Sequence, residues 1–335
     1  MLLAAGRSTR LGALGLALPK PLVPVCGHPA IAYGLHAAAR AGARRVVVNV
    51  FHRGDLVRAA LGPIWRGPAG ELEVQYTVES ELLGTGGGVA NAAAVLGPGS
   101  VLVMNAKVVA DLDLPAFLAA HEAAAHQGAA SATMLLRDDP DPRRWGAIGV
   151  DATGRVVSIL DARSPRAPEG AVTPRMFTGV QVLGPPLRER LRPIFSDLIR
   201  EAYIPALLDG ETIRAVTLPG YFAEHSTPER YLAGNLALLR QPSLLRDPPG
   251  SLTGIDPSAR IHPTARVEQP VRIAAGVEIG AAAQVGPDVV VDAGARVAAG
   301  ARLRRAVVWS GTTATGELTD AVATPTGIVP AEAAG

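Results

Sequence analysis

The sequence predicts an α/β domain with a mostly parallel sheet, followed by a parallel β-helix. Two observations support this fold class. Short β-branched runs alternate with Ala- and Leu-rich stretches up to about residue 240, and aliphatic residues then recur at every sixth position. The alternation is typical of a sheet covered by helices on both faces, whereas a six-residue repeat is typical of a solenoid with three flat faces.

In the first part of the chain, strands are expected at residues 1–4, 46–51, 72–77, 101–105, 131–136, 147–151 and 179–183. Helices are expected at residues 29–42, 53–61, 86–96, 115–127, 196–209 and 228–240. The next stretch is rich in Pro, Gly and Ser, which is typical of a linker. We therefore expect a domain over residues 1–240, a linker over 241–254 and a β-helix over 255–335.

The six-residue repeat runs without a miss. Its positions are Ile255, Ile261, Val267, Ile273, Ile279, Val285, Val291, Val297, Leu303 and Trp309. Another small or aliphatic side chain follows four residues after each of the first nine: Ala259, Ala265, Val271, Val277, Ala283, Val289, Ala295, Ala301 and Val307. Neither a helix nor a simple strand has this period, so each aliphatic residue is expected to point inward from one face of a triangular coil.

Composition excludes several classes of protein. The 335 residues are enough for two domains, and 48% of them are hydrophobic, but no 18-residue run is uninterruptedly apolar, so no membrane span is expected. The first residues are too Gly-rich for a secretory signal. A net charge of +2 without a dense basic patch argues against nucleic acid as a partner. The single cysteine, Cys26, excludes an intrachain disulfide and fits a cytoplasmic location.

A Gly-containing loop follows the first strand directly. It reads LAAGRSTRLG over residues 3–12, and LPKPLVPVCGHP follows over residues 18–29. Gly6 and the small Ser8 and Thr9 let backbone N–H groups approach phosphate oxygens, and Arg10 adds a fork of donors. Lys20 and Lys107 are the chain's two lysines, beside 30 arginines, so a lysine at either place is unusual for this chain.

These stretches resemble the signature of the sugar-1-phosphate nucleotidyltransferases, Ala-Ala-Gly-x-Gly-Thr-Arg-Leu followed by Pro-Lys-Pro-Leu-Val-Pro-Val, with Ser8 in place of a glycine. The resemblance continues at four further places: the LGTGGG run at 83–88, Trp145-Gly146, the FTGV run at 177–180 and the TPERYL run at 227–232. It implies a Rossmann-like domain and a left-handed β-helix, which in this family often serves oligomerisation and regulation.

The resemblance also implies a reaction and its residues. A sugar-1-phosphate would attack the α-phosphate of a nucleoside triphosphate, and pyrophosphate would leave. Arg10 would hold the triphosphate, Lys20 would lie beside the α-phosphate, and Lys107 is the third catalytic candidate. The implied nucleotide-binding residues are Leu3, Ala4, Ala5, Gly6, Arg7, Ser8, Thr9, Gly84, Thr85, Gly86 and Asn105. The implied sugar-phosphate residues are Gly146, Asp161, Arg163, Thr178, Gly179 and Glu224.

The chain departs from the family pattern where a metal would bind. The family has one aspartate at the end of Asn-Gly-Asp and another before Ile-Gly-Thr-Pro, and these positions hold Lys107 and Glu224 here. An ammonium group cannot ligate Mg²⁺. Asp111 lies four residues farther on, about 13 Å away in an extended chain, so it would not replace the first aspartate. We expect no metal site, and Mg²⁺ is a cofactor only if the chain is active.

The sugar side departs from the pattern as well. Where the family has Glu-Lys-Pro, this chain has Asp161, which can replace the glutamate, and Arg163, which can supply the cation one residue out of register.

Three functions stay open. The chain is a transferase in which Lys107 neutralises phosphate charge in place of Mg²⁺, or it is a pseudo-enzyme that binds a nucleotide or nucleotide-sugar and regulates a partner such as an active paralogue. A third class, acyl transfer, would use His262 of the β-helix as its base. Expected partners are a nucleotide, a sugar phosphate and further copies of the chain, joined through the β-helix. The loops resemble the guanylyl and uridylyl branches more than the thymidylyl branch, but do not fix the base or the sugar.

Overall fold

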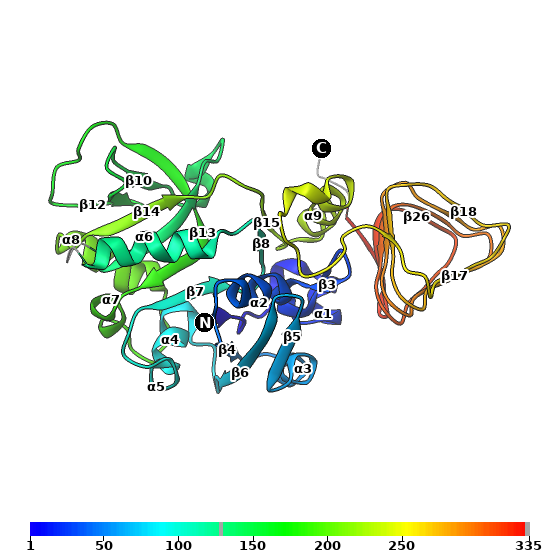
Figure 1. Cartoon of the computed structure of the whole chain (residues 1–335), viewed down its shortest axis with the longest axis horizontal. Coiled ribbons are helices and arrows are strands. Elements are labelled where there is room, and N and C mark those ends of the chain that lie inside the picture. Colours follow the sequence, from blue (N-terminus) through cyan, green and yellow to red (C-terminus); the bar gives the residue numbers. More distant parts are fainter. Residues whose placement is uncertain (127–129, 332–335) are drawn as a thin grey trace. The chain divides into compact units, whose positions relative to one another are not determined.

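The computed structural model describes residues 1–126 and 130–331, and the last residue of the helix expected at 115–127 lies outside these ranges. Figure 1 labels the helices and strands along the chain. Contacts divide the chain into two compact units. The first unit comprises Met1–Gly6, Ala37–Val108 and Leu112–Gly220. The second comprises Arg7–His36, Val109–Asp111 and Tyr221–Gly335, so the expected linker at 241–254 lies inside this unit. No helix within the described ranges is long and apolar enough to cross a membrane.

The centre of the first unit is a parallel sheet. Its strands lie in the order β7-β1-β4-β6, and each pairs in parallel with the next. Their bounds are Val101–Asn105 (β7), Leu2–Leu3 (β1), Arg45–Val50 (β4) and Gly70–Val78 (β6). All of β4 after its first residue is buried, as expected for a Val-rich strand covered on both faces. The prediction of a parallel sheet is confirmed here.

The outer strands are largely antiparallel. The long strand β13 (Thr173–Leu183) pairs antiparallel with β7, with β9 (Ala132–Arg137) and with β10 (Ile148–Val150). β11 (Val156–Ile159), β12 (Ala162–Arg163) and β5 (Ile64–Gly67) join by hairpins, and β14 (Ile213–Thr217) lies parallel to β9. These hairpin strands and β14 are short or partly polar, and the sequence pattern missed them.

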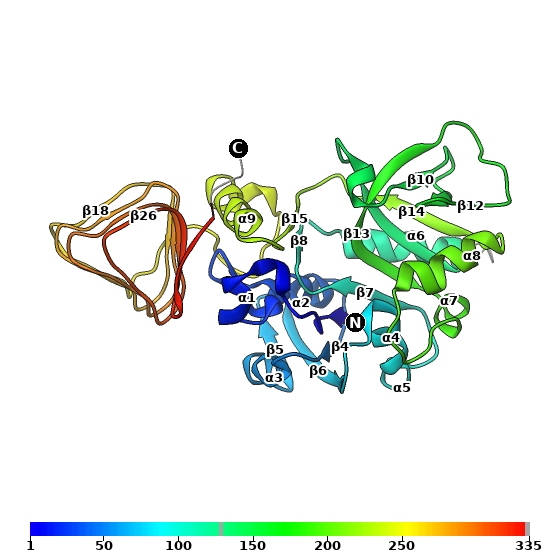
Figure 2. The ribbon, with the colours of Figure 1, turned by 180° about the vertical axis from the view of Figure 1, so that it is seen from behind.

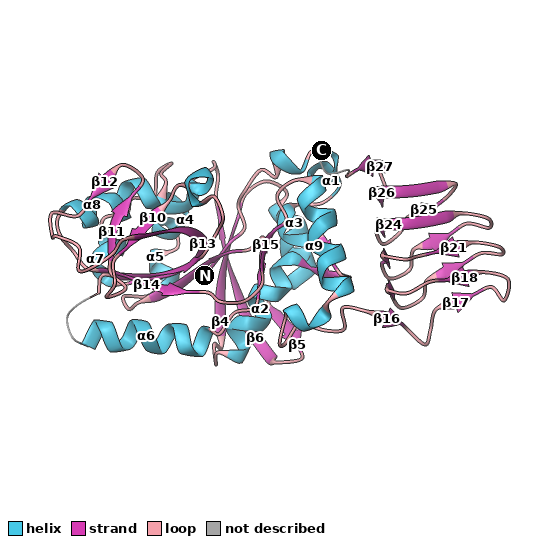
Figure 3. Cartoon of the chain, turned by 90° about the horizontal axis from the view of Figure 1, so that it is seen from above, coloured by secondary structure: helices cyan, strands magenta, loops and turns pink. Residues whose placement is uncertain are grey.

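Helices cover both faces of this sheet. Their bounds are Gly54–Leu61 (α3), Gly84–Asn91 (α4), Ala93–Leu96 (α5), Leu114–His126 (α6), Pro185–Glu189 (α7) and Ile204–Leu208 (α8). Figures 2 and 3 show α6 on the opposite side of the strands from α8. The helix expected at 196–209 is a π-helical turn, η4 (Ile199–Tyr203), followed by α8, because Pro205 cannot donate an α-helical hydrogen bond.

The second unit contains the β-helix, whose coils stack in Figure 3. One face is formed by β16 (Gly254–Ile255), β19 (Val271–Ile273), β22 (Val289–Val291), the end of β24 (Arg302–Val308) and β26 (Glu317–Thr324). A second face has β18 (Arg266–Val267) and β21 (Gln284–Val285), and a third has β17 (Arg260–Ile261), β20 (Glu278–Ile279), β23 (Arg296–Val297) and β25 (Thr313–Ala314). β27 (Gly327–Pro330) closes the end.

Strand register confirms the six-residue repeat. Ile255 lies opposite Ile273, and Val271 lies opposite Val289, an offset of 18 residues, which is three hexads. The repeat then slips, because Val291 pairs with Val308 and not with Trp309. Trp309 is buried in a different core from the one inside the coils.

That different core, which we call the shared core, joins the β-helix to elements from early in the chain. It contains Val290, Val307 and Val322, which alternate along their strands with the residues that point into the coils. These three residues pack in one core with α9 (Pro228–Arg240) and with the segment at residues 9–33. That segment carries η1 (Thr9–Leu11), α1 (Ala13–Ala17), η2 (Lys20–Leu22), β2 (Pro24–Val25), β3 (His28–Pro29) and the start of α2 (Ala30–Arg40). One face of the solenoid is therefore apolar on both sides, which explains its VVV run at 289–291.

Candidate functional site

The loop after β1 is exposed, with an unstrained glycine at its start. Gly6, Arg7, Thr9 and Arg10 are all exposed. A Cβ on Gly6 would meet nothing within 4 Å, so packing does not require a glycine there. Close approach of a ligand to the backbone is another reason to keep one.

Ser8 occupies the place of the missing glycine and adopts a glycine-like conformation. Its φ of 59° lies in the left-handed region, which costs an ordinary residue about 1 kcal/mol. Its hydroxyl accepts a hydrogen bond of 3.0 Å from the backbone N–H of Lys20. The serine thus adopts a conformation that favours glycine, and its hydroxyl adds a hydrogen bond to the second motif.

Positive charge gathers around Lys20 within the second unit. Burial, and to a smaller extent the charges of Arg10 and Arg230, together lower the pKa of Lys20 to about 8. Arg10 lies 4.0 Å from the carboxylate of Glu224, and Arg230 donates to the hydroxyl of Ser226 at 3.3 Å. Sequence reasoning placed Arg10, Lys20 and Glu224 in the site, and it missed Arg230.

His225 follows Glu224 and is buried. Burial, together with the charge of Lys20, lowers its pKa to about 3, so the imidazole is neutral near pH 7. Neither ring nitrogen has a hydrogen-bond partner among the described residues. A Cβ on Gly234 of α9 would lie 2.3 Å from the ring Nε2, so the ring packs closely against the helix backbone.

In the first unit, the glycines of residues 84–88 pack against a protein loop. The Gly86 N–H donates to the Ser196 carbonyl at 3.0 Å, and the Leu198 N–H donates to the Thr85 hydroxyl at 2.9 Å. A Cβ on Gly87 would lie 2.0 Å from the Ile194 carbonyl oxygen. Gly84, Gly86 and Gly87 are therefore needed for the close approach of residues 194–198, whatever ligand the turn binds.

Asn105, the last residue of β7, lies against Gly179, which is in the bulge of β13. A Cβ on Gly179, whose φ is 80°, would lie 2.1 Å from the Asn105 amide nitrogen. The neighbouring Thr178 is buried, and its hydroxyl donates to the Leu135 carbonyl at 2.6 Å, so its side chain is engaged inside the sheet. Lys107 follows Asn105 in the turn before β8 (Val108–Ala110) and is half-buried.

The candidate sugar-phosphate residues Asp161 and Arg163 lie in the exposed β11–β12 hairpin. The Arg163 guanidinium donates to the carbonyls of Leu160 and Ala162 at 2.8 and 3.0 Å. Gly146 ends the turn of η3 (Pro142–Trp145), and a Cβ there would lie 2.8 Å from Leu160. The structure therefore brings Gly146 and the hairpin together through Leu160.

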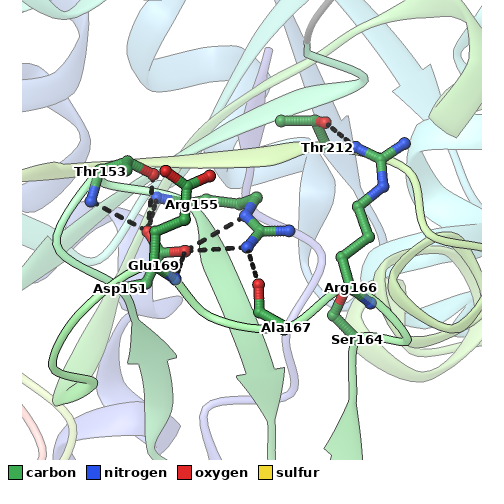
Figure 4. A network of polar contacts seen from close by, with 8 residues as sticks. All are labelled: Asp151, Thr153, Arg155, Ser164, Arg166, Ala167, Glu169 and Thr212. Carbon is green, nitrogen blue, oxygen red and sulfur yellow. Dashed lines mark hydrogen bonds and ion pairs between the residues drawn. The ribbon is translucent and has the colours of Figure 1, made fainter.

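A buried carboxylate organises the segment after this hairpin (Figure 4). Asp151 accepts hydrogen bonds from Thr153, from the backbone N–H of Glu169 and from the guanidinium of Arg155, which in turn donates to the Ala167 carbonyl. Desolvation acts to raise the pKa of Asp151, but these hydrogen bonds outweigh it and hold the pKa well below its usual range. Sequence reasoning missed this network.

Among residues 1–126 and 130–331, no group of three or more His, Cys, Asp or Glu side chains is placed to hold a metal ion. An ammonium group such as that of Lys107 offers no oxygen ligand to Mg²⁺, and the Glu224 carboxylate lies 4.0 Å from the Arg10 guanidinium.

Comparison with known proteins gives consistent relatives. A family model described as "Nucleotidyl transferase" matches residues 1–161. A mannose-1-phosphate guanylyltransferase from Mycobacterium tuberculosis is 30% identical over 242 residues, which are 72% of this chain and 64% of that protein. A mannose-1-phosphate guanyltransferase from Schizosaccharomyces pombe is 28% identical over 271 residues, which are 78% of this chain and 72% of that protein.

The fold also matches a solved structure. The crystal structure of HddC from Yersinia pseudotuberculosis aligns with a TM-score of 0.56 at 21% identity, covering 71% of this chain and 97% of HddC. A second structure of HddC, complexed with GMP-PN, aligns with a TM-score of 0.55. At this identity the likeness establishes the fold.

Proposed function

We propose that this chain, which matches the nucleotidyl transferase family model over residues 1–161 and is similar to mannose-1-phosphate guanylyltransferases, binds a nucleoside triphosphate and a sugar-1-phosphate and transfers the nucleotidyl group from the first to the second. The observation that carries the proposal is the exposed loop that begins at Gly6, beside which Arg10, Lys20 and Arg230 concentrate positive charge. Exposed N–H groups and clustered cations are what a triphosphate requires.

In the proposed reaction, a phosphate oxygen of the sugar-1-phosphate attacks the α-phosphorus, and the bond from that phosphorus to the bridging oxygen breaks. Pyrophosphate leaves with the electron pair. No group of the protein needs to become covalently attached, so catalysis consists of positioning and charge neutralisation. Arg10 and Lys20 would neutralise the phosphates. We propose Asn105 as a contact of the nucleotide, and Gly179 and Arg163 as contacts on the sugar side.

GTP and mannose-1-phosphate are the first substrates to test. Both curated relatives described above are named mannose-1-phosphate guanylyltransferases or guanyltransferases. This chain covers 64% of the length of the mycobacterial protein. We propose the same activity for this chain.

Lys107 distinguishes the two main forms of the proposal. In the active form, its ammonium group neutralises phosphate charge where relatives would hold Mg²⁺, a task that suits a compact point charge. In the second form the chain binds nucleotide or nucleotide-sugar without turnover and regulates a partner, such as an active paralogue. The observation that favours this second form is that Lys107 and Glu224 stand where the family pattern has two aspartates.

Pyrophosphate release from GTP and mannose-1-phosphate separates the two forms. The assay compares the wild type, Lys107→Ala and the double variant Lys107→Asp/Glu224→Asp, each with and without Mg²⁺. Metal-independent turnover that Lys107→Ala abolishes supports the active form. Retained nucleotide binding without turnover, over a broad panel of bases and sugars, supports the regulatory form. Absence of any nucleotide binding by the wild type contradicts both.

We also propose that the chain forms homo-oligomers through the β-helix. The face formed by β17, β20, β23 and β25 carries alternating charges, in which Glu278 lies within ion-pair distance of Arg260 and Arg296. Such a face is complementary to a second copy of itself. Light scattering of the purified chain measures the mass, and a monomer that persists at high concentration contradicts the proposal.

A further inference from the structure

Three neighbouring parallel strands end at one chain of polar contacts. Ala4 follows β1, Asn49 lies near the end of β4, and Glu79 follows β6. The backbone N–H of Ala4 donates to the Asn49 side-chain oxygen at 2.8 Å, and the Asn49 amide nitrogen donates to Glu79 at 2.7 Å. The other carboxylate oxygen of Glu79 accepts the backbone N–H of Leu83 at 2.9 Å. We call these four residues the relay.

The relay is buried, and in each of its hydrogen bonds a donor faces an acceptor. Asn49 is 1% exposed and Glu79 is 4% exposed. Because the Asn49 oxygen faces an N–H donor, its amide nitrogen is left to face the carboxylate. Glu79 receives a donor at each of its two oxygens, which is the acceptor pattern of a carboxylate. Within the low-dielectric interior, such hydrogen bonds to a charged group are strong, and an unmatched one is costly.

Helix α4 is fitted to the same relay. A Cβ on Gly88 would lie 2.8 Å from the Asn49 amide nitrogen and 3.0 Å from the Glu79 carboxylate oxygen. Only a residue without a side chain lets the helix backbone lie this close. The third glycine of the 86–88 run therefore has a structural reason in the relay, while Gly87 has its own in residue 194.

The two ends of the relay are in the two segments that the sequence resemblance assigns to the nucleotide of the proposed function. Ala4 begins the loop that continues through Gly6 to Arg10, and Leu83 begins the turn that contains Gly84 and Thr85. We infer that Asn49 and Glu79 are positioning residues, which hold these two segments at a fixed spacing so that one nucleotide can contact both. The inference rests on the proposed function, and neither residue needs to touch the ligand.

The chemistry of the relay provides its own test. Asn49→Asp places one buried carboxylate against another, and Glu79→Gln leaves an amide donor facing a donor at one of its two contacts. The double variant Asn49→Asp/Glu79→Gln restores a match at every contact, because the new aspartate accepts from Ala4 and from the new glutamine, whose oxygen accepts from Leu83. It also keeps the net charge of the wild type.

The experiment measures GTP affinity by calorimetry, the KM for GTP and kcat where turnover occurs, and amide hydrogen exchange in residues 3–9 and 83–86. We expect each single variant to weaken GTP binding by about tenfold or more and to speed exchange in both segments, and the double variant to return within about threefold of the wild type. The effect should fall on KM more than on kcat.

Two control variants separate positioning from general loss of stability. Asn91→Asp makes the same chemical change at an exposed position of α4. Thr133→Val removes a 2.9 Å partner of the buried His121 in the same unit, and lowers stability without touching the relay. Both should leave GTP affinity unchanged at temperatures where they are folded.

The outcomes are distinct. Faster exchange in the single variants with unchanged GTP affinity overturns the inference while leaving the proposed function in place. Failure of the double variant to restore affinity also overturns it. If the wild type binds neither GTP nor another nucleoside triphosphate, the proposed function fails, and the assignment of the relay to a nucleotide fails with it.

Discussion

Lys20 combines a family motif with an unusual protonation behaviour. Burial, and then the charges of Arg10 and Arg230, bring its pKa from the ordinary value of 10.5 down to about 8. An anion beside the ammonium group favours its charged form and raises the pKa again. Binding of a triphosphate should therefore be coupled to uptake of a proton in the alkaline range.

The first prediction follows from this coupling. Nucleotide affinity should fall as pH rises from 7 to 9, because the Lys20 ammonium loses its proton as the pH passes its pKa of about 8. Lys20→Arg keeps its charge over this range, so its affinity should lose most of the pH dependence, and Lys20→Met should bind weakly at every pH. Calorimetric titration at several pH values is the measurement, and an unchanged slope in Lys20→Arg would contradict the assignment.

Ser8 gives a second prediction at this scale. Ser8→Ala keeps a Cβ at a φ of 59° and loses the hydroxyl that accepts from Lys20, so it should lower the free energy of unfolding by about 1 kcal/mol. Ser8→Gly loses the same hydrogen bond but relieves the backbone, and should be close to neutral. Chemical denaturation measures both, and equal losses in the two variants would show that the backbone conformation is unimportant.

At the residue scale, the sequence predicted some of the candidate site residues and missed others. The loop at 3–12, Lys20 and the LGTGGG run are local motifs, so the pattern located them. Asn49, Glu79 and Arg230 come from separate parts of the chain, and their importance depends on the strand order and on packing around α9. A polar residue inside the apolar run VVVNV was a visible signal for Asn49, but its partner at Glu79 was not.

At the scale of elements, the glycines of α4 behave as spacers for backbone contact. An alanine in the middle of a helix is normally more favourable than a glycine by about 1 kcal/mol. At Gly87 the added Cβ would lie 2.0 Å from the Ile194 carbonyl oxygen, so the usual preference should be reversed.

The third prediction uses this reversal. Gly87→Ala should reduce the free energy of unfolding by about 1–3 kcal/mol through overpacking. Gly99→Ala is the control, since a Cβ there would meet nothing within 4 Å, and its effect should be near zero. Thermal unfolding of the two variants compares them, and equal melting temperatures would show that residues 194–198 yield easily to the added methyl group.

The Asp151 network is the second element-scale case. Its folded-state pKa lies below the unfolded value, so its stabilising contribution is present above about pH 4 and is lost as the pH falls further. Asp151→Asn leaves the buried Arg155 guanidinium without its charge partner, and should cost about 3–5 kcal/mol near neutral pH.

Unfolding followed from pH 7 to pH 3 tests this fourth prediction. The wild type should lose stability over the acidic part of the range, and Asp151→Asn should show a smaller loss there. Asp161→Asn, at an exposed carboxylate, serves as the control with little effect at either end. Parallel curves for the wild type and Asp151→Asn would contradict the role given to this carboxylate.

At the scale of the whole molecule, the shared core limits how the chain can be divided. The segment at 7–36 packs in one core with α9 and with Val290, Val307 and Val322 of the β-helix. The hexad pattern predicted the coils well, because each inward residue repeats. It did not show that one face of the solenoid is buried on its outside too, since that depends on what packs against it.

The fifth prediction concerns truncation. A chain of residues 1–240 lacks the β-helix side of the shared core and exposes Leu11, Val25 and Tyr231. It should therefore be poorly folded, and the amide hydrogens of residues 7–36 should exchange faster than in the full chain. The full chain is the reference. A truncated chain that melts cooperatively at the temperature of the full chain would restore the simpler division at residue 241.

The position of Trp309 has a practical consequence. Its indole nitrogen donates to the Tyr231 hydroxyl at 2.9 Å, and that hydroxyl donates to the Pro24 carbonyl at 2.6 Å, four residues beyond Lys20. The chain has two other tryptophans, Trp65 and Trp145. With both replaced by phenylalanine, the buried indole becomes the single tryptophan fluorophore, and two hydrogen bonds connect it to the segment that follows Lys20. A change in its fluorescence emission on addition of a nucleotide would then report, without an added label, that this segment shifts when the nucleotide binds.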